Sequence, residues 1–362
     1  MAGVVVIFHP EPAAGAGPLE RWVAGARREV ADRHAAGFLA AGAAREDVRV
    51  VAGPPDGVPF GRRLRAFIER EQPDGLVVLG SGAIPLATAA DRRAFLAVAA
   101  GDGPDVLTNN RYSADVVALA RPDVLRALPD SISDNALPRW LAEIAGCAVA
   151  ERRSGRLSID VDGPLDIVLL GRRIGAGRLA SPTDVDLAPV QAALDGLRAA
   201  AADPHAELLV AGRTSGSAIR WLERNVAARV RASVEERGLR SATLAATPSN
   251  IPPNRRPPRS LLGELLERDG PGAFGRLLAS LADAAVIDSR VLLAHRFGAD
   301  EAAWPPPEDR YASDLLLPDR IGDPWLRELT ASAVAAPIPI VLGGHSLVGP
   351  GLRLAVGGGR RR

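Results

Sequence analysis

Short apolar runs alternate with longer helical stretches in the first half of the chain, and this alternation most constrains the fold. Residues 4–8 (VVVIF) and 76–79 (LVVL) are continuous apolar runs, which are typical of strands buried on both faces. Residues 19–43 and 60–71 have helical periodicity, and residues 48–52 (VRVVA) read as a further strand. This alternation favours an α/β fold with a mostly parallel sheet and helices on both faces. In such sheets ligands bind beyond the carboxyl ends of the strands.

A second α/β pattern follows a polar break at residues 203–205 (DPH). Strands are expected at residues 208–211 (LLVA), 284–294 (AAVIDSRVLLA) and 338–342 (IPIVL), with helices between them. We therefore expect one domain over residues 1–202 and a C-terminal α/β domain of unknown role over residues 205–356. Residues 248–259 (PSNIPPNRRPPR) are rich in proline and arginine, which predicts a segment without regular structure.

Composition argues against several functional classes. The 362 residues have a formal net charge of +1, so no strong basic field recruits nucleic acid. No apolar run approaches the roughly 18 residues of a membrane span. The start, MAGVVVIFHPEP, lacks the basic region and cleavage site of a secretion signal, so we expect a cytoplasmic protein without a membrane partner. Its one cysteine, Cys147, excludes an internal disulfide. The sequence contains no lysine, so a bound phosphate would depend on arginine or backbone N–H groups.

Residues 158–167 (SIDVDGPLDI) carry the strongest candidate site. Asp160 and Asp162 are two positions apart at an expected strand end, so both side chains face one side. Asp166 follows a Gly-Pro turn, where a helix is expected to begin. Two converging carboxylates need a cation between them or a proton on one of them, and Mg²⁺ prefers such oxygen ligands together with substrate phosphates. The alternative is a helix start capped by an acid, beside two solvated neighbours.

The order of elements over residues 3–170, ending in this acidic segment, resembles the MobA-like nucleotidyltransferases with a glycosyltransferase-A-like fold. The nearest pattern is that of the 2-phospholactate guanylyltransferases of deazaflavin-cofactor synthesis, whose DVDTPEDL is matched by DVDGPLDI at residues 160–167. Thr108 and Asn109 match the TN pair of the family, and residues 83–86 (AIPL) match its DLPL turn. The resemblance implies transfer of a nucleoside monophosphate from a nucleoside triphosphate to a phosphorylated small molecule or cofactor precursor.

The resemblance also implies roles for particular residues. Asp160 and Asp162 would hold Mg²⁺ and form the catalytic pair. Thr108 and Asn109 would contact the nucleotide or the acceptor, whose own phosphate is the nucleophile. Further candidates to contact the nucleotide are Ser81, Gly82 and Arg21.

Two departures from the family pattern leave other functions open. The third metal-binding aspartate of the family is replaced by Ala83, and the first loop, residues 9–18, has no lysine or arginine. Both changes reduce the charge available to stabilise a reacting triphosphate, although Arg27 and Arg28 follow in the next helix. One alternative is a catalytically degenerate nucleotide- or ligand-binding protein of the same fold. Another is a glycosyltransferase that uses a nucleotide sugar. A homodimer and a monomer both remain open.

A second anion site is a hypothesis for residues 212–217 (GRTSGS), which precede an expected helix. Arg213 would supply a guanidinium fork, Thr214 and Ser215 would supply hydroxyls, and the helix start would supply free N–H groups. The alternative is an ordinary helix cap after a glycine turn.

Other polar patterns favour structure over chemistry. Asp288 and Arg290 lie two apart in an expected strand, where they form ion pairs with neighbours or a site near His295. The pattern GGHSLVG at residues 343–349 lacks the G-x-S-x-G spacing of a hydrolase nucleophile. The five histidines show no zinc-binding spacing.

Overall fold

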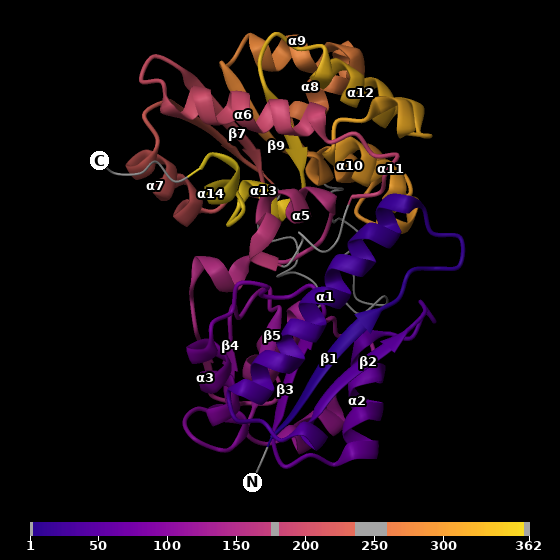
Figure 1. Ribbon diagram of the computed structural model, residues 1–362, viewed down its shortest axis with the longest axis vertical. Helices are drawn as coiled ribbons and strands as arrows, with labels where there is room; N and C mark the ends of the chain where they lie inside the picture. The colour runs from indigo at the N-terminus through magenta and orange to yellow at the C-terminus, as the bar shows by residue number, and fades with distance from the viewer. Residues whose placement is uncertain (1–2, 175–180, 236–258, 358–362) are drawn as a thin grey trace.

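The protein is described by a computed structural model over residues 3–174, 181–235 and 259–357. It is an α/β structure with two separate sheets, which lie one above the other along the long axis of the molecule (Figure 1). Residues 248–258 of the segment expected to be irregular lie outside the described residues.

The first sheet has six strands in the order β2-β1-β3-β5-β4-β6. Its strands are β1 (Val4–Pro10), β2 (Val48–Gly53), β3 (Leu76–Gly80), β4 (Val106–Thr108), β5 (Val116–Leu119) and β6 (Val149–Glu151). Only β5 runs antiparallel to its two neighbours, β3 and β4. The prediction of a mostly parallel sheet is therefore confirmed for this half of the chain.

Helices cover both faces of the first sheet. These helices are α1 (Pro18–Ala40), α2 (Phe60–Glu71), α3 (Ala89–Ala99) and α4 (Leu137–Glu143). Val5 and Ile7 of β1 pack with apolar residues of α1 and α3, whereas Val6 packs with residues of α2 and α4. Successive strand residues point to opposite faces, so a strand covered on both sides needs a continuous apolar run.

The second sheet has four strands, all parallel, in the order β10-β9-β7-β8. Its strands are β7 (Glu207–Gly212), β8 (Arg229–Val234), β9 (Ala284–Asp288) and β10 (Ile340–Gly343). The helices of this half are α6 (Ala188–Ala202), α7 (Gly216–Asn225), α8 (Leu261–Asp269), α9 (Phe274–Ala279), α10 (Ser289–Phe297), α11 (Pro307–Asp314), α12 (Pro324–Val334), α13 (His345–Val348) and α14 (Leu352–Ala355).

The strand expected over residues 284–294 is shorter than predicted. Strand β9 ends at Asp288 and helix α10 begins at Ser289, so Arg290 lies on a helix. The prediction of a strand beyond Asp288 was wrong because a short apolar run does not distinguish a buried strand from a buried helix.

Helices α1 and α5 (Pro164–Leu170) connect the two sheets (Figure 1). The first half of α1, including Leu19, Trp22 and Val23, belongs to the same apolar core as the second sheet. Helix α6 also packs on this sheet, against β7, β9 and β10. The apolar core around the second sheet therefore contains residues from before and after the break at residues 203–205.

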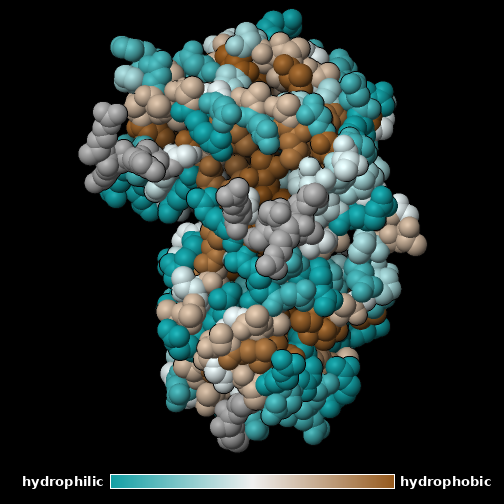
Figure 2. Space-filling view, viewed as in Figure 1, coloured by the Kyte–Doolittle hydropathy of each residue, from teal (hydrophilic) through white to brown (hydrophobic). Residues whose placement is uncertain are grey.

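The surface is unevenly apolar. Figure 2 shows apolar side chains gathered in the upper part of the view, around the second sheet, while polar side chains dominate the lower part. None of the helices in the described part of the chain combines the length and apolarity that crossing a bilayer requires.

Candidate active site

A cleft of about 250 Å³ lies at the carboxyl ends of β1 and β3. Phe8 and residues 78–83 form one side of it, and residues 160–162 cross it. Asp115 and Asp134 line the cleft from the neighbouring part of the sheet. The cleft therefore has the position expected of a ligand site in a mostly parallel sheet.

Asp160 and Asp162 are held against the loop that follows β3. Asp160 pairs with Ala83 in an isolated antiparallel bridge, and the N–H of Val161 donates to the carbonyl of Gly82 at 3.0 Å. Both aspartates line the cleft, together with Val161 between them.

Burial raises the pKa of Asp160 well above its ordinary value, and the charges of Asp162, Asp115 and Asp166 raise it further. A hydrogen bond from the Ser346 hydroxyl to Oδ1 of Asp160 acts in the opposite direction. Without a cation, this surrounding favours the protonated form of Asp160, so the carboxylate group can bind a proton or a positive ligand.

Arg27, on helix α1, is the arginine that reaches the cleft. Its Nε donates to the carbonyl of Val161 at 2.7 Å, and its Nη2 lies 3.4 Å from Oδ1 of Asp162. The Asp162 side chain is 67% exposed, so this ion pair is screened by water. Arg21 does not line the cleft, and its guanidinium donates to the carbonyl of Ala16. The two arginines lie about 1.7 helical turns apart, so they point to different sides of the helix and only Arg27 faces the cleft.

Asp166 is the first-turn acid of α5, as the sequence predicts. Its Oδ2 accepts hydrogen bonds from the N–H groups of Asp162 and Gly163, both at 2.9 Å. Burial, with a contribution from the charge of Asp162, raises the pKa of Asp166 to about 7. Asp166 therefore holds the backbone around Asp162 in place at the start of the helix.

Ser81 lies in the cleft and Gly82 lines it. The Ser81 hydroxyl is 3.1 Å from Nδ1 of His9, and both side chains are buried at the ends of β3 and β1. Burial and the charge of Arg28 lower the pKa of His9. A neutral imidazole therefore orients this hydroxyl.

Ala83 contributes only backbone atoms to the site. Its carbonyl oxygen is 2.7 Å from Nε2 of His34, a ring that is 1% exposed. No carboxylate occupies this position, in agreement with the departure seen in the sequence.

Thr108 and Asn109 have structural roles and do not line the cleft. The Thr108 hydroxyl donates to the carbonyl of Val116 at 2.9 Å. Nδ2 of Asn109 donates to Asp115 at 2.6 Å and to the carbonyl of Leu157 at 2.7 Å, and its Oδ1 accepts from the N–H of Asp115 at 3.0 Å. Asn109 therefore positions Asp115, which lines the cleft, and the segment that leads to Asp160.

Three residues at or beside the cleft were not singled out from the sequence, namely His9, Asp115 and Asp134. His9 directly follows an apolar run, which is a usable signal. The position of Ser346 at an expected strand end makes it a candidate to line a ligand cleft. The structure places its hydroxyl on Asp160, 186 positions away, and no local pattern predicts this partner.

At the expected second anion site, the guanidinium of Arg213 already forms an ion pair within the protein. Nε and Nη2 of Arg213 donate to the Asp288 carboxylate at 2.7 and 3.0 Å. The Ser215 hydroxyl caps α7 by accepting from the N–H of Ala218 at 3.1 Å. Thr214 is fully buried, and its hydroxyl has no partner among the described residues. The geometry thus matches the helix-cap alternative.

Arg290 also forms a buried ion pair, as the sequence predicts for this polar pattern. Its Nη1 and Nη2 donate to the carboxylate of Asp314 at 2.5 and 2.6 Å. Both partners are largely buried, with side-chain exposures of 14% and 3%. Such a pair fixes α10 against α11, and loss of one partner would leave a buried charge.

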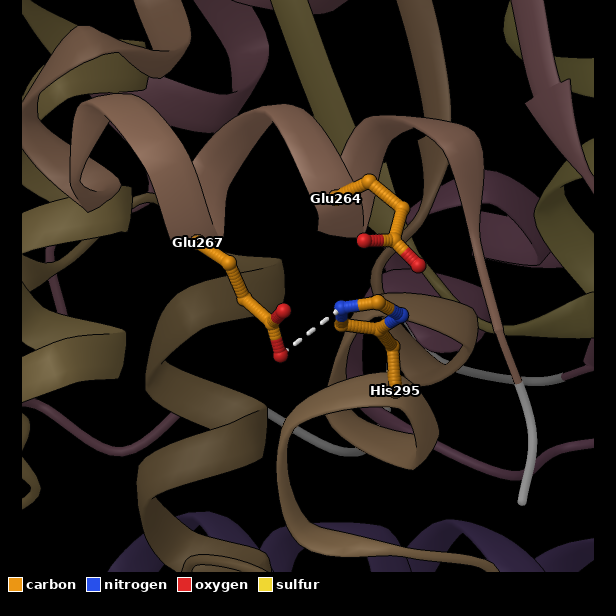
Figure 3. A group of neighbouring side chains, drawn as sticks. All are labelled: Glu264, Glu267 and His295. Carbon is orange, nitrogen blue, oxygen red and sulfur yellow. Dashed lines mark ion pairs between the residues drawn. The ribbon is translucent and has the colours of Figure 1, made fainter.

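Glu264, Glu267 and His295 form a group of potential metal ligands in the second half (Figure 3). Nδ1 of His295 accepts from the N–H of Ser260 at 3.0 Å, so a neutral ring carries its proton on Nε2. That nitrogen lies 3.1 Å from Glu267, and Arg259 already pairs with both glutamates. A protonated Nε2 has no lone pair for a metal, so the group is best described as a polar cluster between α8 and α10.

No protein-family model and no curated protein sequence matches this chain.

Proposed function

We propose that the protein is a nucleotidyltransferase of glycosyltransferase-A-like fold, with Asp160 and Asp162 at its active site. The observation that carries the proposal is the placement of these two carboxylates in one cleft, at the carboxyl edge of the first sheet. The sheet order β2-β1-β3-β5-β4-β6, with a single antiparallel strand, supports it. The resemblance of residues 160–167 to the DVDxPxD segment of MobA-like enzymes supplies the reaction class.

The proposed reaction joins a phosphate oxygen of the acceptor to the α-phosphorus of a nucleoside triphosphate. The bond from that phosphorus to the bridging oxygen of the leaving group breaks, and pyrophosphate departs. Carboxylate oxygens fit Mg²⁺, so Asp160 and Asp162 would hold the ion, which would neutralise charge on the phosphates. Arg27 orients residues 161–162 through its two contacts and adds a positive charge at the cleft.

The experiment is a pyrophosphate-release assay with a panel of nucleoside triphosphates and phosphorylated acceptors, with and without Mg²⁺. Asp162→Asn should abolish release, because it removes a ligand charge at an exposed position without disturbing the core. Asp195→Asn, on the solvent side of α6, is the matched control and should retain activity. Equal activity of the two variants would refute the assignment.

A second function, a catalytically degenerate nucleotide-binding protein, is favoured by two observations. Position 83 is an alanine where the family has an aspartate, and the carboxylate of Glu308 accepts from the N–H groups of Leu19 and Glu20 at the start of α1. A helix start is a common phosphate site, and here an internal acid occupies it. This protein would show nucleotide-dependent thermal stabilisation without pyrophosphate release. Nucleotide sugars belong in the same panel, since tighter binding of these than of triphosphates would indicate a glycosyltransferase.

A further inference from the structure

Ser346 lies on a helix that follows the second sheet, and it contacts Asp160, which lines the cleft of the first. Strand β10 ends at Gly343, Gly344 precedes helix α13, and Ser346 is the second residue of that helix. The Ser346 side chain is 4% exposed, and its hydroxyl donates to Oδ1 of Asp160. The contact is therefore buried and joins two elements that are remote in the sequence.

Tight packing delivers the serine to this position. A Cβ at Gly343 would lie 3.0 Å from the Leu165 side chain, so β10 approaches α5 as closely as a glycine permits. After the helix, the N–H of Gly351 donates to the carbonyl of Ser346 at 2.8 Å. The close approach of β10 and this hydrogen bond hold the backbone on either side of Ser346 where its hydroxyl contacts Asp160.

We propose that Ser346 is a positioning residue for the Asp160 carboxylate, so that a residue from the second half of the chain orients a side chain of the cleft. A carboxylate has more than one acceptor site on each oxygen, so the hydrogen bond fixes the orientation of the group and leaves the other oxygen for a ligand. This inference rests on the proposed function for its catalytic consequence, although the contact itself can be tested without any activity.

Three other acids lie around Asp160. Asp162, Asp115 and Asp166 face it from its own segment, from the start of β5 and from α5. Arg27 of α1 pairs with Asp162, and Arg290 of α10 is paired with Asp314 of α11. A cation held by Asp160 and Asp162 would offset the repulsion among these acids, so a hydrogen bond that orients Asp160 should strengthen the binding of Mg²⁺.

The test is a calorimetric titration of Mg²⁺ into the full chain. Ser346→Ala should weaken Mg²⁺ binding about tenfold, the effect expected when the hydrogen-bond partner of a metal ligand is lost. Ser346→Thr keeps the hydroxyl and should restore the original affinity. Ser313→Ala is the matched control, because it removes a buried hydroxyl that pairs with Thr330 at 2.8 Å, away from the cleft.

The proposal is overturned if Ser346→Ala binds Mg²⁺ like the wild type, or if Ser313→Ala weakens binding by the same amount. A wild-type protein that does not bind Mg²⁺ would overturn both this proposal and the proposed function. If Ser346→Ala fails to fold, Ser346→Thr against Ser346→Val gives the same comparison with similar volumes. Weaker Mg²⁺ binding by Ser346→Ala, in a protein without transferase activity, would support the positioning contact and refute the proposed function alone.

Discussion

The carboxylate of Glu308 accepts hydrogen bonds from the backbone N–H of Leu19, at 3.1 Å from each of its oxygens. Glu308 lies on α11 in the second half of the chain, and Leu19 is in the first turn of α1. A Cβ at Gly17 would lie 2.2 Å from the carboxyl group of Glu308, so a larger residue there would displace this carboxylate from the helix start. The helix that covers the first sheet is thus capped by the half of the chain that forms the second.

Glu308→Ala should lower the free energy of unfolding by about 1 kcal/mol. It removes a capping acceptor and a negative charge that interacts favourably with the positive end of the helix dipole. Urea unfolding at fixed salt measures the change. Glu223→Ala, at an exposed position of α7, is the control and should be close to neutral. Equal effects of the two substitutions would contradict the capping role.

The buried His34 should make the protein less stable in acid. Burial lowers the pKa of His34 from 6.5 to about 4, so between these values the unfolded chain binds the proton and the folded chain does not. Stability is therefore lost as pH falls from 6.5 towards 4, by up to about 3 kcal/mol. The free energy of unfolding measured across this range should show a weaker loss in His34→Gln. His205→Gln, at an exposed position, should behave like the wild type, and a similar slope in His34→Gln would count against the interpretation.

Asp166 should have the opposite effect on the pH dependence of stability. Burial raises its pKa from 3.8 to about 7, so between these values the folded chain binds the proton and the unfolded chain does not. This contribution favours folding at low pH and is lost as pH rises through about 7, with an upper limit of about 4 kcal/mol. Asp166→Asn retains an acceptor for the N–H groups of Asp162 and Gly163. Its stability relative to the wild type should therefore improve as pH rises from 4 to 7, and a constant difference would refute this pKa.

Arg27 and Arg21 provide a direct comparison for the cleft. If the cleft binds a nucleoside triphosphate, Arg27→Gln should weaken binding about tenfold, the effect expected for loss of a charged contact. Arg21→Gln should leave the affinity unchanged because Arg21 does not line the cleft. Calorimetric titration at one salt concentration distinguishes them, and melting curves show whether loss of the Arg27 contact to Val161 has altered the fold. Equal affinities would place the nucleotide elsewhere.

Local patterns in the sequence were sufficient for the elements of the fold. The apolar runs at residues 4–8 and 76–79 are buried strands, and Asp166 begins a helix after a Gly-Pro turn. These features depend on contacts within a few residues or on burial of a whole face, which residue periodicity records. The boundary between β9 and α10 was missed because a short run buried on all sides has no periodicity that separates strand from helix.

The sequence alone determined that this chain forms α/β layers, because the periodicity of apolar residues records which faces of strands and helices are buried. It also predicts, from strand geometry, that Asp160 and Asp162 face one side of an extended segment. Only the tertiary structure decided which polar groups meet. In the folded chain Asn109 donates to Asp115, and Arg213 forms an ion pair with Asp288. Arg27 lines the cleft whereas Arg21 does not, and Ser346 contacts Asp160. Such partnerships depend on how separate elements pack, and packing is set by the shape and burial of whole faces rather than by neighbours in the chain.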